Sequence, residues 1–216
     1  MKFRSILFVP GHEEKKIKKA YTLEADLIVL DLESTVPPEK KEDAKKIIKS
    51  CNVDKKNTYI RIDTKKDLEF VTIESFPGIL LPFTETLAQL NEVNEILKIK
   101  ENVKTNVIPI LESINGLANI KEICSFEERV NIISFGSHDL AKSINLKVSE
   151  DEKEILEFRK NIITNSKNLL KPIDTSYLDF KDLIGFEKSC QKVKSLGFGG
   201  KACIHPDQIR ICNKVF

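Results

Sequence analysis

The sequence predicts an α/β protein, a short (β/α)8 TIM barrel that forms a single domain over residues 1–216. Eight short apolar segments recur along the chain, and charged segments separate them. The apolar segments are nearly solid in Ile, Leu and Val, which is typical of parallel strands that are covered on both faces. No Gly-, Ser- or Pro-rich linker interrupts the series, which favours one domain. A doubly wound open sheet is the main alternative.

Each apolar segment is expected to form one strand. In chain order they are residues 5–11, 27–33, 58–63, 78–83, 106–112, 130–136, 171–177 and 201–206. The second strand is expected to end at the double proline Pro37–Pro38, because proline cannot continue a ladder and restricts the residue before it.

The segments between the strands have the pattern of amphipathic helices. Residues 13–25 and 86–100 carry apolar side chains every three or four positions among lysines and glutamates. Only residues 63–77 separate the third and fourth strands, so a helix there must be brief. After the sixth strand, a short helix in 137–146 and a longer one in 149–170 are expected.

Composition excludes several classes of protein. Hydrophobic residues make up 41% and charged residues 31%, as in soluble globular proteins. Lys and Arg (35) nearly balance Asp and Glu (33), so the net charge of +2 gives no support for nucleic-acid binding. Apolar runs are too short for a membrane span or a signal peptide, and the five cysteines are scattered like reduced thiols. A cytoplasmic location is therefore expected.

Carboxylates follow many of the predicted strands, whose carboxyl ends meet at one mouth. The strand-end groups are Asp31, Glu33, Arg61, Asp63, Glu112, Asp139, Asp174 and His205. A lone carboxylate after a strand is often a helix N-cap, and Asp31 and Asp63 keep that interpretation open. Several carboxylates in one mouth repel each other unless a cation neutralises them, and oxygen ligands suit Mg²⁺ or Mn²⁺. Glu112 and Asp139, on adjacent strands, can each supply one ligand.

Arg61 lies at the end of an apolar strand, where a guanidinium is costly unless it faces a polar mouth. Its fork suits a substrate carboxylate or a developing oxyanion. A salt bridge to Glu33 or Glu112 that holds the barrel closed is an equally open interpretation.

Known phosphate-binding and zinc motifs are absent from the sequence. Neither G-x-G-x-x-G nor G-x-x-x-x-G-K-[ST] occurs, and the histidines lack the spacing of zinc ligands. Arg4, Lys15 and Lys16 flank the first strand and its turn; phosphate contacts and a solvated lysine face both stay open for them.

The strand ends, in this order, resemble the citrate lyase β-subunit family, which belongs to the HpcH/HpaI-type superfamily of metal-dependent aldolases and acyl-CoA lyases. The similarity extends from residue 4 to about residue 210. It is carried by RSILFVPG, ADLIVLDLES, YIRID, GILLP, IPILESINGL, ISFGSHDLA, PIDTSYLDFKDLIGF and LGFGGKACIHPDQI.

The resemblance implies a (β/α)8 barrel and a Mg²⁺-dependent carbon–carbon lyase, with Mn²⁺ as an alternative ion. The implied substrate is a 3-hydroxy-acyl thioester such as citryl-, malyl- or citramalyl-CoA, which yields a 2-oxo acid and an acyl thioester. Glu112 and Asp139 are implied as the metal ligands. A homotrimer, and citrate lyase α and acyl-carrier subunits as partners, are also implied.

The remaining roles carried over from the family concern substrate and catalysis. Arg61 is implied as the catalytic residue that binds the substrate's carboxylate, and Glu33 as a catalytic residue that supports the metal's water shell. Arg4 is implied near the CoA end or the mouth of the barrel. Gly136 and Ser137 are implied as further substrate-binding residues.

Three positions depart from the family's usual pattern. Ser34 and His138 stand where an acid is common, and Phe83 stands where a lysine is common. These departures leave two alternatives open, namely a 2-oxo acid aldolase that works without CoA and a degenerate paralogue that only binds a metabolite. The general base is also open among Glu33, Asp179 and a metal-bound hydroxide.

Overall fold

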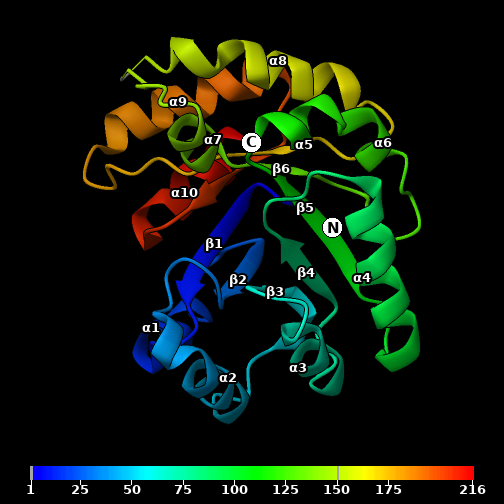
Figure 1. Ribbon diagram of the computed structural model, residues 1–216. Helices are drawn as coiled ribbons and strands as arrows, with labels where there is room; N and C mark the ends of the chain where they lie inside the picture. The colour runs from blue at the N-terminus through cyan, green and yellow to red at the C-terminus, as the bar shows by residue number, and fades with distance from the viewer. Residues whose placement is uncertain (1, 150) are drawn as a thin grey trace.

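The computed structural model describes residues 2–149 and 151–216; Met1 and Glu150, the latter in the predicted helical segment 149–170, lie outside the described residues. Eight parallel strands in chain order close into a barrel (Figure 1). They are β1 (Ser5–Pro10), β2 (Leu27–Asp31), β3 (Thr58–Arg61), β4 (Gly78–Leu81), β5 (Asn106–Leu111), β6 (Ser134–Phe135), β7 (Ile173–Asp174) and β8 (Gly200–Cys203). β1 pairs with β8 from Ser5 opposite Lys201 to Leu7 opposite Cys203, which confirms the barrel and rules out the open sheet.

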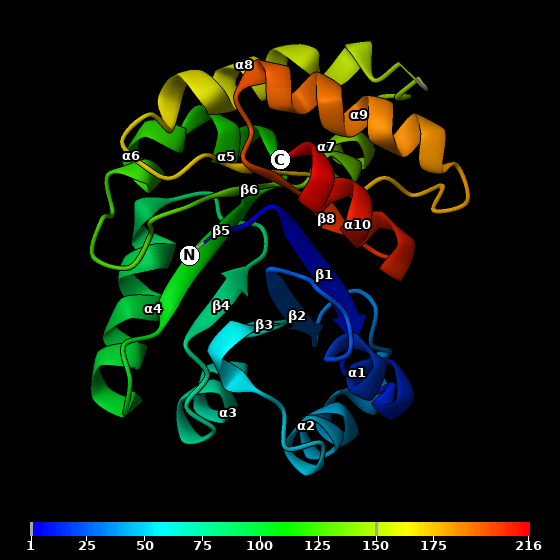
Figure 2. The same ribbon diagram turned by 180° about the vertical axis from the view of Figure 1, so that it is seen from behind.

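Helices surround the strands, and Figures 1 and 2 both show α8 and α9 side by side outside the barrel. The α-helices are α1 (Glu14–Ala20), α2 (Lys41–Ser50), α3 (Asp67–Ile73), α4 (Leu87–Lys100), α5 (Ile114–Ala118), α6 (Ile120–Cys124), α7 (Ser137–Ser143), α8 (Leu156–Asn165), α9 (Leu183–Leu196) and α10 (Pro206–Val215). Short 3-10 helices are η1 (Pro38–Lys40), η2 (Lys55–Asn57) and η3 (Lys153–Ile155). The brief helix after β3 and the short and longer helices after β6 are confirmed, although α1 and α8 are shorter than predicted.

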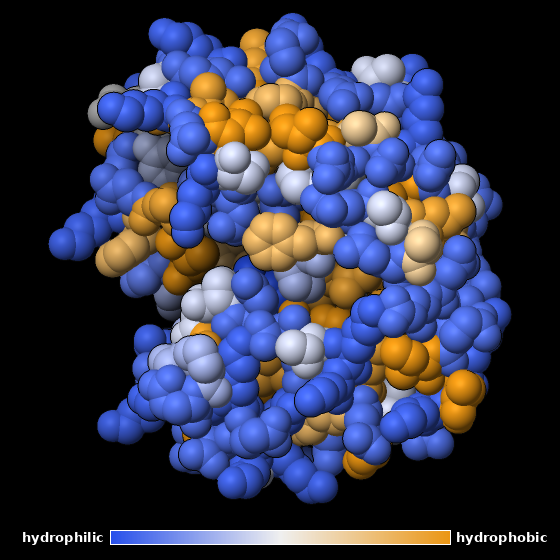
Figure 3. All heavy atoms as spheres, viewed as in Figure 1, coloured by the Kyte–Doolittle hydropathy of each residue, from blue (hydrophilic) through white to orange (hydrophobic). Residues whose placement is uncertain are grey.

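Two hydrophobic cores follow from the alternation of side chains along each strand. One core fills the barrel interior and includes Ile6, Leu27, Val29, Tyr59, Leu80, Ile108, Ile110, Ile132 and Ile173. The larger core lies between the strands and the helices, where Leu7, Ile28, Leu30 and Ile60 meet side chains such as Ile17, Ile48 and Val71. Both faces of the strands are thus buried, which explains their nearly solid apolar sequences. Hydrophilic side chains cover most of the face that Figure 3 shows.

Asp174 belongs to the layer between barrel and helices, and its predicted place in the mouth is wrong. Its neighbour Ile173 points into the barrel, so Asp174 points outward. There it accepts hydrogen bonds from Arg159 of α8, at 2.9 and 3.0 Å, and from the Lys201 ammonium. Arg159 also pairs with Glu152 at 3.0 Å. Asp174, Arg159 and Lys201 are fully buried, so their opposite charges compensate one another away from water.

Arg4 was implied to lie near the CoA end or the mouth; it lies at the amino end of β1, opposite the mouth, so the second of these two places is wrong. Its Nε and Nη2 donate to the two carboxylate oxygens of Asp26 at 2.8 Å each, and Nη1 donates to the Asn213 carbonyl at 3.2 Å. The side chain therefore ties the start of β1 to the start of β2 and to α10.

No helix within residues 2–149 and 151–216 is both long enough and apolar enough to cross a membrane.

Replacing Arg159 with Met should strongly destabilise the protein. The change keeps the length of the side chain but leaves Asp174 and Glu152 with one cation fewer, so we expect the free energy of unfolding to fall by about 3–5 kcal/mol. Urea denaturation at pH 7 measures it. Lys160→Met on the same helix is the matched control, because Lys160 is exposed and its one ion-pair partner among the described residues is the exposed Glu157. A similar loss in both variants would contradict the compensation of the buried charges.

Candidate active site

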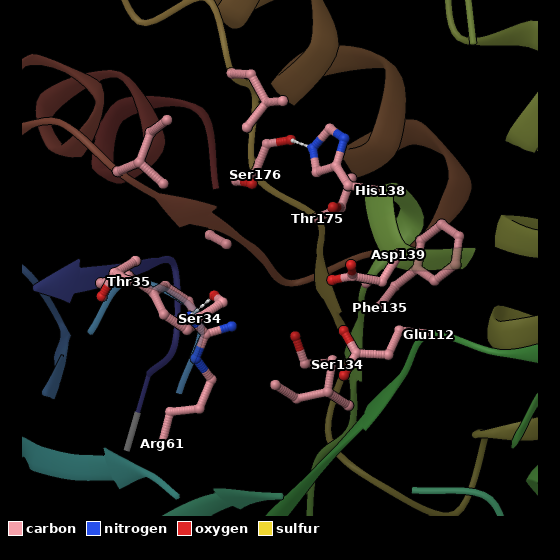
Figure 4. A pocket seen from close by; sticks show the side chains of 16 residues that line it. Ser34, Thr35, Arg61, Glu112, Ser134, Phe135, His138, Asp139, Thr175 and Ser176 are labelled. Atoms are coloured by element: carbon pink, nitrogen blue, oxygen red, sulfur yellow. Dashed lines mark hydrogen bonds between the residues drawn. The ribbon is translucent and has the colours of Figure 1, made fainter. Parts of the chain in front are cut away.

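A cavity of about 270 Å³ opens at the carboxyl ends of the strands. Figure 4 shows Glu112 and Asp139 on one side of it and Arg61 with Ser34 on the opposite side. Its lining residues are Phe8, Ser34, Thr35, Arg61, Ile110, Glu112, Ser134, Phe135, Gly136, His138, Asp139, Thr175, Ser176, Leu178, Ala202 and Ile204.

Glu112 is the most constrained acid of the cavity. It follows β5, where Ile108 and Ile110 point into the barrel, so the two-residue repeat directs it inward as well. Its Oε1 accepts the backbone N–H of Phe83 at 2.8 Å. A Cβ atom on Gly136 would lie 2.6 Å from Oε2, so the glycine leaves room for this carboxylate.

Asp139 lies in the first turn of α7, directly after β6. Gly136 precedes that helix, and the Ser137 N–H donates to Thr175 Oγ1 at 3.3 Å, which joins the start of α7 to the end of β7. His138 Nε2 lies 3.0 Å from the Ser176 carbonyl; because a carbonyl only accepts, this nitrogen donates. These contacts fix the turn that brings Asp139 beside Glu112.

The pKa of Glu112 is raised to about 7, chiefly because burial disfavours the charged carboxylate. The Phe83 N–H and the charge of Arg61 lower this pKa, whereas the negative charge of Asp139 raises it. Glu112 is therefore a buried carboxylate beside a second, exposed one, and neither has an ion-pair partner among the described residues.

These residues fit a bound Mg²⁺. No group of three or more His, Cys, Asp or Glu side chains suited to a metal occurs in the described part of the chain. Mg²⁺ does not need one, since it often binds through one or two carboxylates and takes its other oxygens from water and substrate. Glu112 and Asp139 would be the protein ligands, and the ion would compensate the negative charge whose burial, together with repulsion from Asp139, raises the pKa of Glu112.

Arg61 faces the cavity from β3, and acids hold it in place. Its Nε and Nη2 each lie 2.6 Å from an oxygen of Asp31, which is fully buried. Nη1 lies 3.0 Å from Glu33 Oε2, and the guanidinium lies 5.1 Å from the centre of the Phe8 ring. Burial alone would raise the pKa of Asp31, but the hydrogen bonds and charge of Arg61 bring it below its usual value. The salt bridge to Glu33 is confirmed, and Asp31 is an ion-pair partner rather than a simple helix cap.

The structure brings together most, but not all, of the predicted site residues. Arg61, Glu112, Gly136 and Asp139 line the cavity, Glu33 contacts Arg61, and Ser137 contributes its backbone. Two lining residues that the sequence did not single out are Ser134 and Thr175. Ser134 follows Ile132 by two residues, and Thr175 follows Ile173 by two, so both side chains point into the barrel as those isoleucines do. This two-residue spacing would have identified them if the strand register had been known.

The three departures from the family pattern all lie at this mouth. Ser34 Oγ accepts from Arg61 Nη2 at 2.6 Å, and His138 lines the cavity. Phe83 supports Glu112 through its backbone N–H rather than its side chain, and every residue type except proline has such an N–H.

Comparisons with known proteins agree with this geometry. A family model described as HpcH/HpaI aldolase/citrate lyase matches residues 4–206. The chain belongs to the HpcH/HpaI aldolase/citrate lyase family. This finding confirms the resemblance seen in the strand ends.

Two named relatives and a solved structure are similar over nearly the whole chain. Mitochondrial citramalyl-CoA lyase of Rattus norvegicus is 30% identical over 241 residues, covering 99% of this chain and 71% of the relative. Citrate lyase subunit beta of Leuconostoc mesenteroides subsp. cremoris is 27% identical over 231 residues, covering 99% and 76%. The crystal structure of protein CitE from Mycobacterium tuberculosis in complex with magnesium and pyruvate has a TM-score of 0.86 at 25% identity, covering 99% and 92%.

Glu112 should make the stability of this HpcH/HpaI family member depend on pH. Its pKa of about 7 is above the ordinary 4.5, so its favourable contribution is complete below pH 4.5 and is lost as the pH rises through 7. We expect Glu112→Gln, which keeps the shape without the charge, to raise the free energy of unfolding at pH 8 by roughly 2 kcal/mol without metal.

Urea denaturation in EDTA at pH 5 and pH 8 measures this effect, and the gain should shrink at pH 5. Glu122→Gln on α6 is the control, because Glu122 is exposed. A gain at pH 8 that Glu122→Gln reproduces would contradict the role of burial.

Proposed function

We propose that this protein is a Mg²⁺-dependent carbon–carbon lyase that cleaves, or forms in reverse, a short 3-hydroxy-acyl thioester such as citramalyl-, malyl- or citryl-CoA. The observation that carries the proposal is the pair Glu112 and Asp139 facing Arg61 across one cavity. The family supports the reaction class, and the magnesium and pyruvate bound to the similar CitE structure support the ion and a 2-oxo acid product.

The residues of the cavity divide the chemistry among them. Glu112 and Asp139 would hold the ion, which when bound supplies a Lewis acid for the oxygens of the substrate. Arg61 binds the carboxylate next to the hydroxyl-bearing carbon and thereby orients the bond that breaks. Loss of the hydroxyl proton and cleavage of the adjacent carbon–carbon bond turn that carbon into the carbonyl group of the 2-oxo acid. The electron pair of the broken bond stays on the α-carbon of the thioester, which then takes up a proton.

The structure bears on which acid could remove the hydroxyl proton. Asp179 is one proposed base, but its Oδ1 accepts the backbone N–H of Lys181 at 3.1 Å in the loop before α9, and it does not line the cavity. Glu33 does not line the cavity either, but it contacts Arg61, which does. The geometry therefore disfavours Asp179.

A second cavity supports a CoA thioester over a substrate without CoA. It is about 520 Å³, shares Phe8 and Ile204 with the first, and is lined by Lys15, Lys16 and Lys19 of α1. Phosphate groups of a carrier in the lysine-lined cavity would leave its acyl end to reach Arg61 across Phe8. This placement favours the phosphate-contact interpretation of Lys15 and Lys16 over a solvated lysine face.

A homotrimer, a cytoplasmic location, and citrate lyase α and acyl-carrier subunits as partners stay predictions.

The lyase reaction itself is the first test. We expect wild type with Mg²⁺ to release a 2-oxo acid, detected as its phenylhydrazone, from at least one of citramalyl-, malyl- and citryl-CoA. Glu112→Ala should lower kcat/KM on the order of a hundredfold and abolish Mg²⁺ binding in calorimetry, because one of two ligands is lost. The exposed Glu122→Gln should match wild type. If wild type binds no Mg²⁺ even with pyruvate present, the proposed function fails.

The lysine-lined cavity gives a separate prediction about CoA. Replacing Lys15, Lys16 and Lys19 with Gln should raise KM for the CoA thioester about tenfold and leave kcat nearly unchanged, because phosphate contacts act far from the reacting bond. In the direction of condensation, KM for the free 2-oxo acid should not change. Steady-state kinetics at fixed ionic strength measures both constants.

A matched triple variant separates a local phosphate site from net charge. Lys98, Lys100 and Lys104 are exposed at the end of α4 and after it, and their change to Gln removes the same charge. Equal increases in KM in both triple variants would contradict a phosphate site at α1.

A further inference from the structure

The guanidinium of Arg61 is held along two edges, one by a buried and fixed partner and the other by more exposed partners that a ligand can displace. Its Nε and Nη2 edge lies against Asp31, at 2.6 Å for each nitrogen. The Asp31 carboxylate also accepts the backbone N–H groups of Glu33 at 2.9 Å and Thr35 at 3.0 Å, and it is fully buried. Asp31 is therefore a fixed partner that sets the direction of the arginine.

The other edge, formed by Nη1 and Nη2, is held by groups that can leave. Nη1 lies 3.0 Å from Glu33 Oε2, and Nη2 donates to Ser34 Oγ at 2.6 Å. The Glu33 side chain is 20% exposed, and within the described residues its carboxylate contacts only the Arg61 cation. Ser34 is exposed at the cavity. Neither group has the network that fixes Asp31.

A substrate carboxylate that approaches from the cavity needs this same edge. Planar carboxylates bind a guanidinium best through two parallel N–H contacts, and the Nε and Nη2 pair is already taken by Asp31. The remaining pair is Nη1 with Nη2, where Glu33 and Ser34 lie. Two carboxylates on Nη1 would repel each other, whereas the Ser34 hydroxyl adds no charge and has a proton to donate.

We propose that Glu33 is a built-in competitor of the substrate, which occupies Arg61 in the free protein and is displaced when the carboxylate of the 2-oxo acid or acyl thioester binds. The inference rests on the proposed function for the identity of the ligand. Ser34 stays at the site, and its hydroxyl group donates a hydrogen bond to the incoming carboxylate. The exchange keeps a carboxylate on Arg61 in both states, so the arginine does not move while the ligand changes.

Glu33→Gln tests the displacement directly. The amide keeps the shape of the side chain but binds Arg61 weakly, so a larger fraction of the protein has a free Nη1. We expect the dissociation constant of pyruvate, measured by calorimetry with saturating Mg²⁺, to fall about tenfold, as for a competing state that holds nine-tenths of the protein. Thermal unfolding of each variant checks that it is folded.

Asp63→Asn is the matched control for net charge. Asp63 follows Arg61 by two residues, is partly exposed like Glu33, and pairs with Lys41 instead of Arg61. The change in charge is the same, so an equal fall in the pyruvate dissociation constant would mean that only the electrostatic field had changed. That result would overturn the displacement, as would an unchanged or weaker affinity in Glu33→Gln.

Ser34→Asp adds a second competitor at the same edge and should weaken pyruvate binding about tenfold. Tighter binding in this variant would overturn the inference. A fall in kcat of a hundredfold or more in Glu33→Gln, with pyruvate affinity unchanged, would make Glu33 a catalytic residue and also overturn it. These outcomes are separate from failure of the lyase itself, which is a wild type that binds pyruvate but releases no 2-oxo acid from the CoA thioesters.

Discussion

The two-residue repeat of a β-strand decides which polar groups enter the mouth of this barrel. Residues that point into the barrel form series that end in the site, namely Leu27, Val29 and Asp31 on β2, Tyr59 and Arg61 on β3, and Ile108, Ile110 and Glu112 on and after β5. On β7 the series is Ile173 and Thr175, which leaves Asp174 facing the helices. A shift of one residue therefore separates a structural acid from a catalytic one.

Charge is balanced differently on the two sides of the strands. In the outer layer, Asp174 and Glu152 face Arg159 and Lys201, so two acids meet two cations. At the mouth, Asp31 and Glu33 pair with the guanidinium of Arg61, whereas Glu112 and Asp139 have no ion-pair partner among the described residues. Buried negative charge without a partner is unfavourable, and the raised pKa of Glu112 is its direct result. A bound divalent cation would neutralise this excess of negative charge at the mouth.

The sequence predicted the architecture and the central trio of the site, but not the direction of every side chain. Arg61, Glu112 and Asp139 could be identified because each lies at or shortly after the end of an apolar strand. A charged side chain there avoids burial in the hydrophobic core most easily by facing the mouth. Asp174 looked equivalent, since strands buried on both faces have no polar face from which to read the alternation. The mouth was the wrong place for Arg4 because the role carried over from the family was given more weight than the position of Arg4 before the first strand, which already put it at the amino end.

The backbone conformation around Glu112 is another feature that the sequence alone does not reveal. Phe83 has a φ of +47°, in the left-handed region that costs a residue other than glycine about 1–2 kcal/mol. That backbone turn aims its N–H at Glu112 Oε1, and the missing Cβ of Gly136 leaves space beside Oε2. One oxygen is thus fixed by the protein and the other faces a neighbour that cannot crowd it. Burial and like charge act directly on the Glu112 carboxylate, and the strained backbone of Phe83 holds it, so these unfavourable contributions meet at the group whose position the proposed metal chemistry needs most.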